Sequence, residues 1–129
     1  MTVYKTIIDP QVASAAITMA QPFPAGGGVL ATQAVTTTAS DVFAVVIDNS
    51  LNTSASYLKC YDSVGAAAIG TTHPFMILKS DAASKVQYSF DRGVAFSTGI
   101  EAAVLTSKGT AGTTAPSSQV NLTFLVTPT

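Results

Sequence analysis

The sequence predicts an all-β domain: an antiparallel β-sandwich or jelly roll with an extended N-terminal arm. The first observation is strict alternation of apolar and polar residues, plainest over 119–127 (QVNLTFLVT). The second is that segments rich in Gly, Ser, Thr and Pro separate such runs. The third is the lack of long helical periodicity. The one helical candidate, 12–20 (VASAAITMA), is disfavoured by its β-branched residues and flanking prolines.

These alternating and apolar runs predict about nine strands, spaced as in a sandwich or jelly roll. They cover 3–8, 29–37, 42–49, 56–62, 74–79, 85–91, 94–98, 100–107 and 119–127. The run 42–49 (VFAVVIDN) is apolar on both faces, which predicts a central strand covered on two sides. The alternation places these side chains in the core: Phe43, Ile47, Val86, Phe90, Leu122 and Phe124.

The chain of 129 residues is long enough for one domain with a real core. We expect an arm over residues 1–24 and the sandwich over 25–129, joined by a hinge at the three glycines 26–28. Prolines remove backbone donors, so the arm should reach outward rather than join the sandwich interior. Eight extended residues span more than about 20 Å, enough to add 3–8 to the sheet edge of a neighbouring subunit.

The composition predicts a protein that does not remain a monomer. Apolar residues make up 47% and charged residues 10%, against about a quarter charged in ordinary soluble domains. A surface of small and hydroxyl side chains is easily buried against a partner. The net charge is −1 and the six basic residues are scattered, which argues against nucleic-acid binding.

The sequence also offers no sign of a membrane span or a targeting signal. No apolar run approaches the roughly 18 residues of a membrane span, so no membrane association is expected. The Ala-rich stretch near residue 12 follows Asp-Pro and has no cationic start, so we expect synthesis in the cytoplasm without processing.

The sequence offers no catalytic or metal-binding constellation, so we expect neither an enzyme nor a cofactor or metal site. The single histidine, His73, is interpreted as a loop residue before a proline, and the single cysteine, Cys60, as a buried, unreactive thiol. Four acids at predicted strand ends are interpreted as turn caps: Asp48, Asp62, Asp81 and Asp91.

Two further features suggest surfaces for contact. Tyr57 and Tyr61 share one face of their strand, as a sugar-stacking platform would require. The chain has no Trp, which favours the alternative that these rings pack under other structure or at a subunit contact. In 93–109 (GVAFSTGIEAAVLTSKG), Gly99 permits a turn, while Ala102 and Ala103 allow strands or subunits to approach closely.

A family resemblance carries the functional prediction. The run 54–114 contains YLKCYD (57–62), GTTHP (70–74) and GVAFSTGI (93–100), followed by a small-residue strand and a Gly/Thr/Ala loop. This order resembles a β-sandwich module of tailed-bacteriophage virion proteins, and the match covers about half of the chain. Members of that group are capsid cement or decoration proteins, or domains of other virion appendages.

The resemblance implies a capsid cement protein that binds the major capsid protein, as a homotrimer on the capsid surface of the virion, after synthesis in the host cytoplasm. The alternative is a receptor- or carbohydrate-binding module of a tail or head fibre. The candidate interface comprises four arm residues and four sandwich residues: Val3, Tyr4, Ile7, Ile8, Tyr57, Tyr61, Ala102 and Ala103.

Overall fold

The computed structural model describes residues 15–21 and 31–129, and it is all-β over them. The described residues form eight strands and no helix, which confirms the predicted fold class. The strands are β1 (Ala15–Gln21), β2 (Gln33–Thr36), β3 (Ser40–Asp48), β4 (Ser56–Asp62), β5 (Met76–Ser80), β6 (Lys85–Phe96), β7 (Ile100–Leu105) and β8 (Val120–Pro128).

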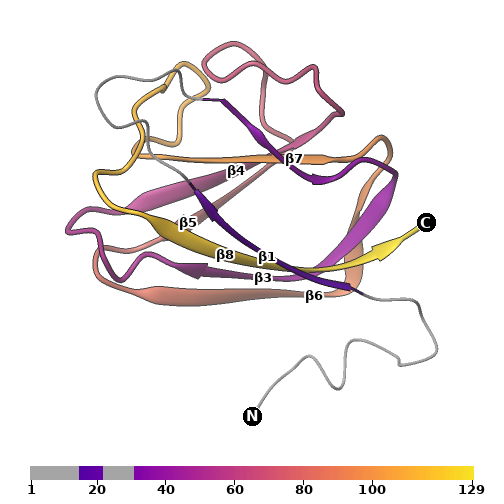
Figure 1. Ribbon diagram of the computed structural model, residues 1–129, viewed down its shortest axis with the longest axis horizontal. Helices are drawn as coiled ribbons and strands as arrows, with labels where there is room; N and C mark the ends of the chain where they lie inside the picture. Colours follow the sequence, from indigo (N-terminus) through magenta and orange to yellow (C-terminus); the bar gives the residue numbers. More distant parts are fainter. Residues whose placement is uncertain (1–14, 22–30) are drawn as a thin grey trace.

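The strands form two four-stranded antiparallel sheets that face each other (Figure 1). Sheet A has the order β1-β8-β3-β6, and sheet B has the order β2-β7-β4-β5. Each early strand pairs with its counterpart counted from the end of the chain: β1 with β8, β2 with β7, β3 with β6 and β4 with β5. Such nested pairing is a long antiparallel ribbon rolled into two sheets, which is the jelly-roll topology.

The boundary predicted between arm and sandwich is wrong for part of the chain. Residues 15–21, assigned to the arm, form β1 and pair with β8 from Ala15↔Val126 to Gln21↔Val120. This stretch contains no proline, and an edge position lets a strand rich in small residues join the sheet through one neighbour alone. Residues 1–14 and 22–24, including the strand expected at 3–8, lie outside the described residues.

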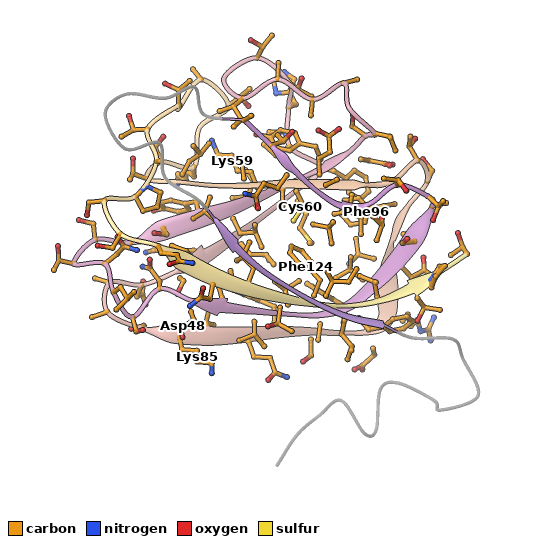
Figure 2. The ribbon with its side chains drawn as sticks, in the orientation of Figure 1. Asp48, Lys59, Cys60, Lys85, Phe96 and Phe124 are labelled. Atoms are coloured by element: carbon orange, nitrogen blue, oxygen red, sulfur yellow. The ribbon has the colours of Figure 1, made fainter. Side chains whose placement is uncertain are left out.

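The core lies between the two sheets. Figure 2 shows Phe96 and Phe124 in this layer, and both are at most 1% exposed. Ile47, Leu122 and Phe124 are confirmed as core residues, while Val86 and Phe90 are partly buried against the core.

Phe43, also predicted in the core, faces away from it. The pairing of β3 with both neighbours shifts register between Val42 and Ala44, so Val42 and Val45 point inward although three positions separate them. Phe43 instead covers Gly93 of β6: a Cβ built on that glycine would lie 3.1 Å from the Phe43 ring. The irregularity reverses the alternation that the sequence pattern implied.

The two strands expected at 85–91 and 94–98 are one strand, β6. Gly93 has a φ of +76°, which bends the chain, and pairing with β3 resumes at Val94↔Val42. Asp91 therefore lies within a strand, and the prediction that it caps a strand end is wrong.

Two buried asparagines fasten the loops at one end of the sandwich. The Asn49 side chain donates to the Ser54 and Asp81 carbonyls, at 3.0 Å each. Asn52 donates to Asn49 Oδ1 at 2.9 Å and accepts from the Ser118 amide at 2.8 Å. Buried amide groups require hydrogen-bond partners. Here those partners tie the segment after β3 to the segment before β8.

Candidate functional site

The outer face of sheet B, which points away from sheet A, is buried by two loops. These are residues 63–75, between β4 and β5, and residues 106–119, between β7 and β8; Figure 1 shows both on this side of sheet B. Strand alternation assigns to this face the residues that flank the core side chains of β4 and β7. Five of them are less than 5% exposed: Lys59, Tyr61, Glu101, Ala103 and Leu105.

Lys59 fastens the 106–119 loop to the sheet. Its side chain is fully buried, and Nζ donates to the Gly109 carbonyl at 2.5 Å; Figure 2 shows the residue on the loop-covered side of the sheet. Burial lowers the pKa of Lys59, because a low-dielectric environment disfavours the ammonium. The loop also meets its neighbour where His73 Nδ1 lies 3.1 Å from Thr110 Oγ1, so the two loops form one cover.

Glu101 lies under the 63–75 loop and accepts from its donors, as Lys59 lies under the 106–119 loop and donates to it. The Thr32 hydroxyl donates to its Oε1 at 2.5 Å. Burial acts to raise the pKa of Glu101, but the Ser63 and Thr32 hydroxyls and the nearby Ala67 and Gly65 amides outweigh it, so the pKa lies below its ordinary value. The second oxygen, Oε2, is buried and makes no hydrogen bond within the described residues. The loop donors that lower this pKa nevertheless stabilise the carboxylate in its ionised form.

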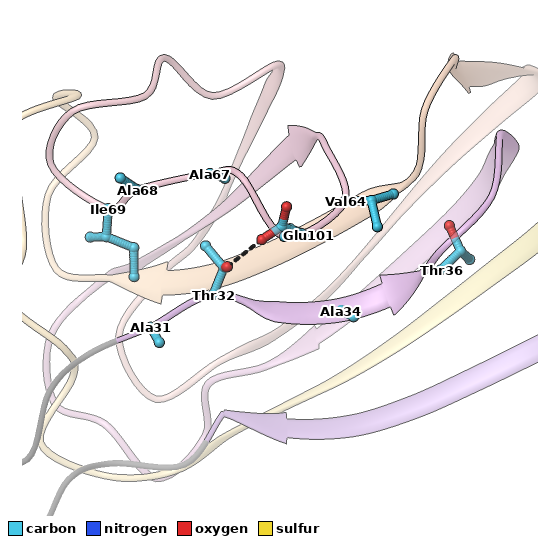
Figure 3. Close-up of a pocket in the computed structure, with 10 residues that line it drawn as sticks. Ala31, Thr32, Ala34, Thr36, Val64, Ala67, Ala68, Ile69 and Glu101 are labelled. Atoms are coloured by element: carbon cyan, nitrogen blue, oxygen red, sulfur yellow. Dashed lines mark hydrogen bonds between the residues drawn. The ribbon is translucent and has the colours of Figure 1, made fainter.

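Glu101 belongs to the wall of a groove of about 560 Å³ (Figure 3). The groove lies between the β2 segment and the loop that follows β4, and Ala34 of β2 is the cross-strand partner of Glu101. The other lining side chains are small or aliphatic, and no aromatic ring is among them: Ala31, Thr32, Thr36, Val64, Gly65, Ala67, Ala68 and Ile69. The sequence signalled Glu101 only as a lone acid in an apolar strand, which does not reveal a groove.

Asp62, at the end of β4, holds the turn between β6 and β7. Its carboxylate accepts from the Ser97 amide and hydroxyl at 3.0 and 2.9 Å, and from the Thr98 amide at 2.8 Å. Burial acts to raise the pKa of Asp62, but these hydrogen bonds outweigh it and lower the pKa. Asp48 likewise accepts from the Ser50 amide at 3.1 Å, so the prediction of turn caps is confirmed for Asp48 and Asp62.

The predicted interface residues differ in their exposure and in whether the structure describes them. Tyr61, Ala102 and Ala103 are at most 1% exposed within their own chain, so they offer no surface to a partner and the expectation is corrected for them. For Tyr61 and Ala103 the physical reason is the loop cover over sheet B, which no local pattern indicates, whereas Ala102 faces the core between the two sheets. Tyr57 is half-buried. Val3, Tyr4, Ile7 and Ile8 lie outside the described residues.

The remaining candidates for chemistry are isolated from one another. Cys60 is fully buried, and burial raises the pKa of its thiol to about 12, which confirms the unreactive interpretation. Within residues 15–21 and 31–129, no group of three or more His, Cys, Asp or Glu side chains lies together as a metal site would need. The same residues include no helix long and apolar enough to cross a membrane.

An exposed apolar pair lies at the edge of sheet B. Phe75 and Ile77, beside and within edge strand β5, are 54% and 41% exposed. The Phe75 ring rests edge-on against Phe96, with centroids 4.9 Å apart. Sequence reasoning missed this pair, although the run PFMILK (74–79) is apolar on both faces and could have indicated it.

Comparison with known proteins adds no relative: no protein family, no curated protein and no solved structure matches the chain.

Proposed function

We propose that this chain is a bacteriophage capsid cement protein, a homotrimer that binds the major capsid protein on the outside of the virion and strengthens the shell. The sequence resemblance over 54–114 is the origin of the proposal. The observation that carries it furthest is the jelly-roll topology, which viral capsid domains share. Because folds host many functions, the surface has to supply the rest of the argument.

The surface suits broad, charge-poor contacts. With 10% charged residues, little charge has to be desolvated when the surface is covered, and desolvation is the main cost of burying ions. A standard interface buries about 800 Å² per partner, and three such contacts in a symmetric trimer reinforce one another through multivalency.

Phe75 and Ile77 are the best-placed side chains for such a contact. Their exposed apolar surface lies at the edge of a sheet, where a neighbour can approach without displacing a strand. The edge is not open to simple strand addition along its length, because the Tyr88 hydroxyl donates to the Lys79 carbonyl at 2.5 Å. Side-chain packing is therefore the expected mode of contact.

The alternative, a receptor- or carbohydrate-binding module, gains support from the same topology, since lectin domains include jelly rolls. The tyrosine platform that would favour it is absent from the described surface, because Tyr61 is 1% exposed. A glycan would therefore need another surface.

The decisive experiment measures self-association and shell binding together. Sedimentation of the purified chain should show a trimer, and the chain should cosediment with capsid shells of the phage that carries its gene. Phe75→Ser should weaken shell binding or trimer formation, because it removes an exposed ring from the proposed contact. Leu51→Ser is the matched control, since Leu51 is 63% exposed on a different loop, and it should have no effect.

A stable monomer that binds no shells would overturn the proposal. If the chain instead bound an immobilised glycan and no shells, the carbohydrate-binding alternative would replace it.

A further inference from the structure

Strand β6 forms the longest edge of the sandwich. It has 12 residues, and within residues 15–21 and 31–129 it pairs with β3 alone. The free side of an edge strand presents backbone amides and carbonyls to which another strand can add. The neighbouring edge strand β5 is partly closed to such addition, because the Tyr88 hydroxyl bonds the Lys79 carbonyl. The free side of β6 is therefore the longer site for a further strand.

The hydrogen bonds between β3 and β6 show which residues face this free side. The Asn49 amide donates to the Ser84 carbonyl at 2.8 Å, one step beyond the paired Asp48 and Lys85. Hydrogen-bonded and non-hydrogen-bonded positions alternate along an antiparallel pair of strands. Lys85 and each second residue up to Ser89 therefore direct their backbone amides and carbonyls away from β3, toward the free side.

The sequence of this strand is complementary to itself in the antiparallel direction. Residues 85–91 read KVQYSFD, with Lys85 at one end and Asp91 at the other. When two copies pair about Tyr88, Lys85 of each copy lies opposite Asp91 of the other. The pairs between them match in the same way, polar with polar and apolar with apolar: Gln87 with Ser89, and Val86 with Phe90.

The two copies also match in side-chain direction. Residues 85, 87, 89 and 91 are exposed, whereas 86, 88 and 90 pack partly buried against the core. Residues directly opposite each other in a sheet lie on the same face, so the ion pairs form on the outer face and the apolar pairs on the core side. A shift of two residues is the smallest that keeps the outward backbone groups opposite each other. It places Lys85 opposite Ser89 or Gly93 and removes the ion pairs.

We infer that β6 pairs with β6 of a second copy across a two-fold axis at Tyr88, so that sheet A continues from one chain into the next. Within its own chain Lys85 lies beside Asp48 (Figure 2). Across the described part of the chain, however, the one salt bridge joins Lys79 and Asp81. Lys85 and Asp91 thus keep their charges for a partner. Another protein would have to repeat this order of charges, whereas a second copy carries it already.

This contact goes beyond the proposed function, and its symmetry is different. A two-fold contact closes after two copies, so β6 pairing by itself produces a dimer and not a trimer. If the proposed trimer forms through another surface, β6 pairing would join two trimers into a hexamer. The two contacts can therefore be tested separately.

Sedimentation equilibrium over a series of concentrations tests the pairing. The molar mass of the purified chain should double as the concentration rises, from monomer to dimer or from trimer to hexamer. Lys85→Glu sets two acids against each other at each end of the contact, and Asp91→Lys sets two lysines against each other. Like charges directly opposite each other destabilise a strand pair, so each variant alone should associate about tenfold more weakly, or less.

A mixture of these two variants gives the sharpest result. The acids at 85 and 91 of one chain then lie opposite the lysines at 91 and 85 of the other, so the mixture should recover the doubled mass although neither variant associates alone. Lys108→Glu makes the same change of charge as Lys85→Glu at an exposed position outside β6, and it should associate as the parent does. All three positions are exposed, so each variant should keep the circular dichroism spectrum of the parent.

Three results would each overturn the inference: a parent mass that does not change with concentration, single variants that associate as the parent does, or a mixture that fails to recover the doubled mass. Failure of the proposed function is seen separately. The chain can form no trimer and bind no shells while β6 pairing still doubles its mass.

Discussion

The two sheets of this jelly roll are built from the same kind of ribbon, yet their outer faces differ. On sheet A, the outer side of β6 carries polar and charged side chains that are open to solvent, among them Lys85, Gln87 and Ser89. On sheet B, all six residues of β7 are buried, including the outward-facing Glu101 and Ala103. The difference arises from the two loops that cover sheet B (Figure 1), whereas no other segment of residues 15–21 and 31–129 buries the outward-facing Lys85, Gln87 and Ser89 of β6.

The comparison shows that charged residues on the face of a sheet can hold the loops that bury them. Glu101, an acceptor, lies under a loop that presents amide and hydroxyl donors, whereas Lys59, a donor, bonds the Gly109 carbonyl of the other loop. Each charge thus matches the backbone polarity of the loop above it. On sheet A the equivalent charges are solvated and contribute little to stability.

The largest expected effect tests whether the sheets depend on a common core. Phe124 of β8 is fully buried between the sheets, so Phe124→Ala should lower the free energy of unfolding by about 3 to 5 kcal/mol. Chemical denaturation, followed by circular dichroism, measures the change. A loss below about 1 kcal/mol would show that the sheets do not share this core.

The second prediction compares one lysine from each outer face. Lys59→Ala should cost about 2 to 3 kcal/mol, because it empties a fully buried site and releases the Gly109 carbonyl. Lys85→Ala, at an exposed position in β6, should stay within about 0.5 kcal/mol.

Lys59→Met separates the packing of the lysine stem from its charge. It keeps the stem volume and removes an ammonium whose pKa burial lowers, so it should restore most of the stability that alanine loses. Equal losses at Lys59 and Lys85 in the same denaturation experiment would erase the distinction between the two faces.

The third prediction concerns the acid that holds the β6–β7 turn. Asp62→Ala removes the acceptor for the Ser97 and Thr98 amides and should cost about 1 to 2 kcal/mol in thermal unfolding. Asp91→Ala, on exposed β6, is the control and should change stability by less than about 0.5 kcal/mol. A neutral Asp62→Ala variant would mean that the turn holds without its carboxylate.

The smallest expected effect is a pH dependence. The folded-state pKa of Glu101 lies below its ordinary value of 4.5, so the unfolded chain binds the proton first as pH falls. Its stabilising contribution is complete above the ordinary value and is lost as pH falls through the folded-state value. Asp48 and Asp62 act in the same direction, because their pKa values are also lowered.

Glu101→Gln should therefore flatten, without abolishing, the fall in melting temperature between neutral and acidic pH. Melting curves that stay parallel to those of the parent across this range would show that Glu101 does not contribute.

Much of the fold could be predicted from the sequence because strand alternation is a local property. The pattern of β8 placed Leu122 and Phe124 in the core, and the structure confirms both. Prediction failed where strand pairing overrides the local pattern of apolar and polar residues. The irregularity after Val42 turned Phe43 outward. Pairing with β8 places residues 15–21 in the sheet as β1. Neither event leaves a signal in the segment that it changes.

The sequence by itself determined that the chain forms β-strands with one apolar layer, because side chains alternate along every strand and the polar ones cannot be buried unpaired. Only the tertiary structure decided that Tyr61, Lys59 and Glu101 lie beneath loops, and that Glu101 borders a groove. Those outcomes depend on where residues 63–75 and 106–119 settle, and that involves long-range contacts such as the bond from Lys59 to Gly109, 50 residues away. The physical reason is that burial is a property of assembled neighbours, whereas alternation is a property of one strand.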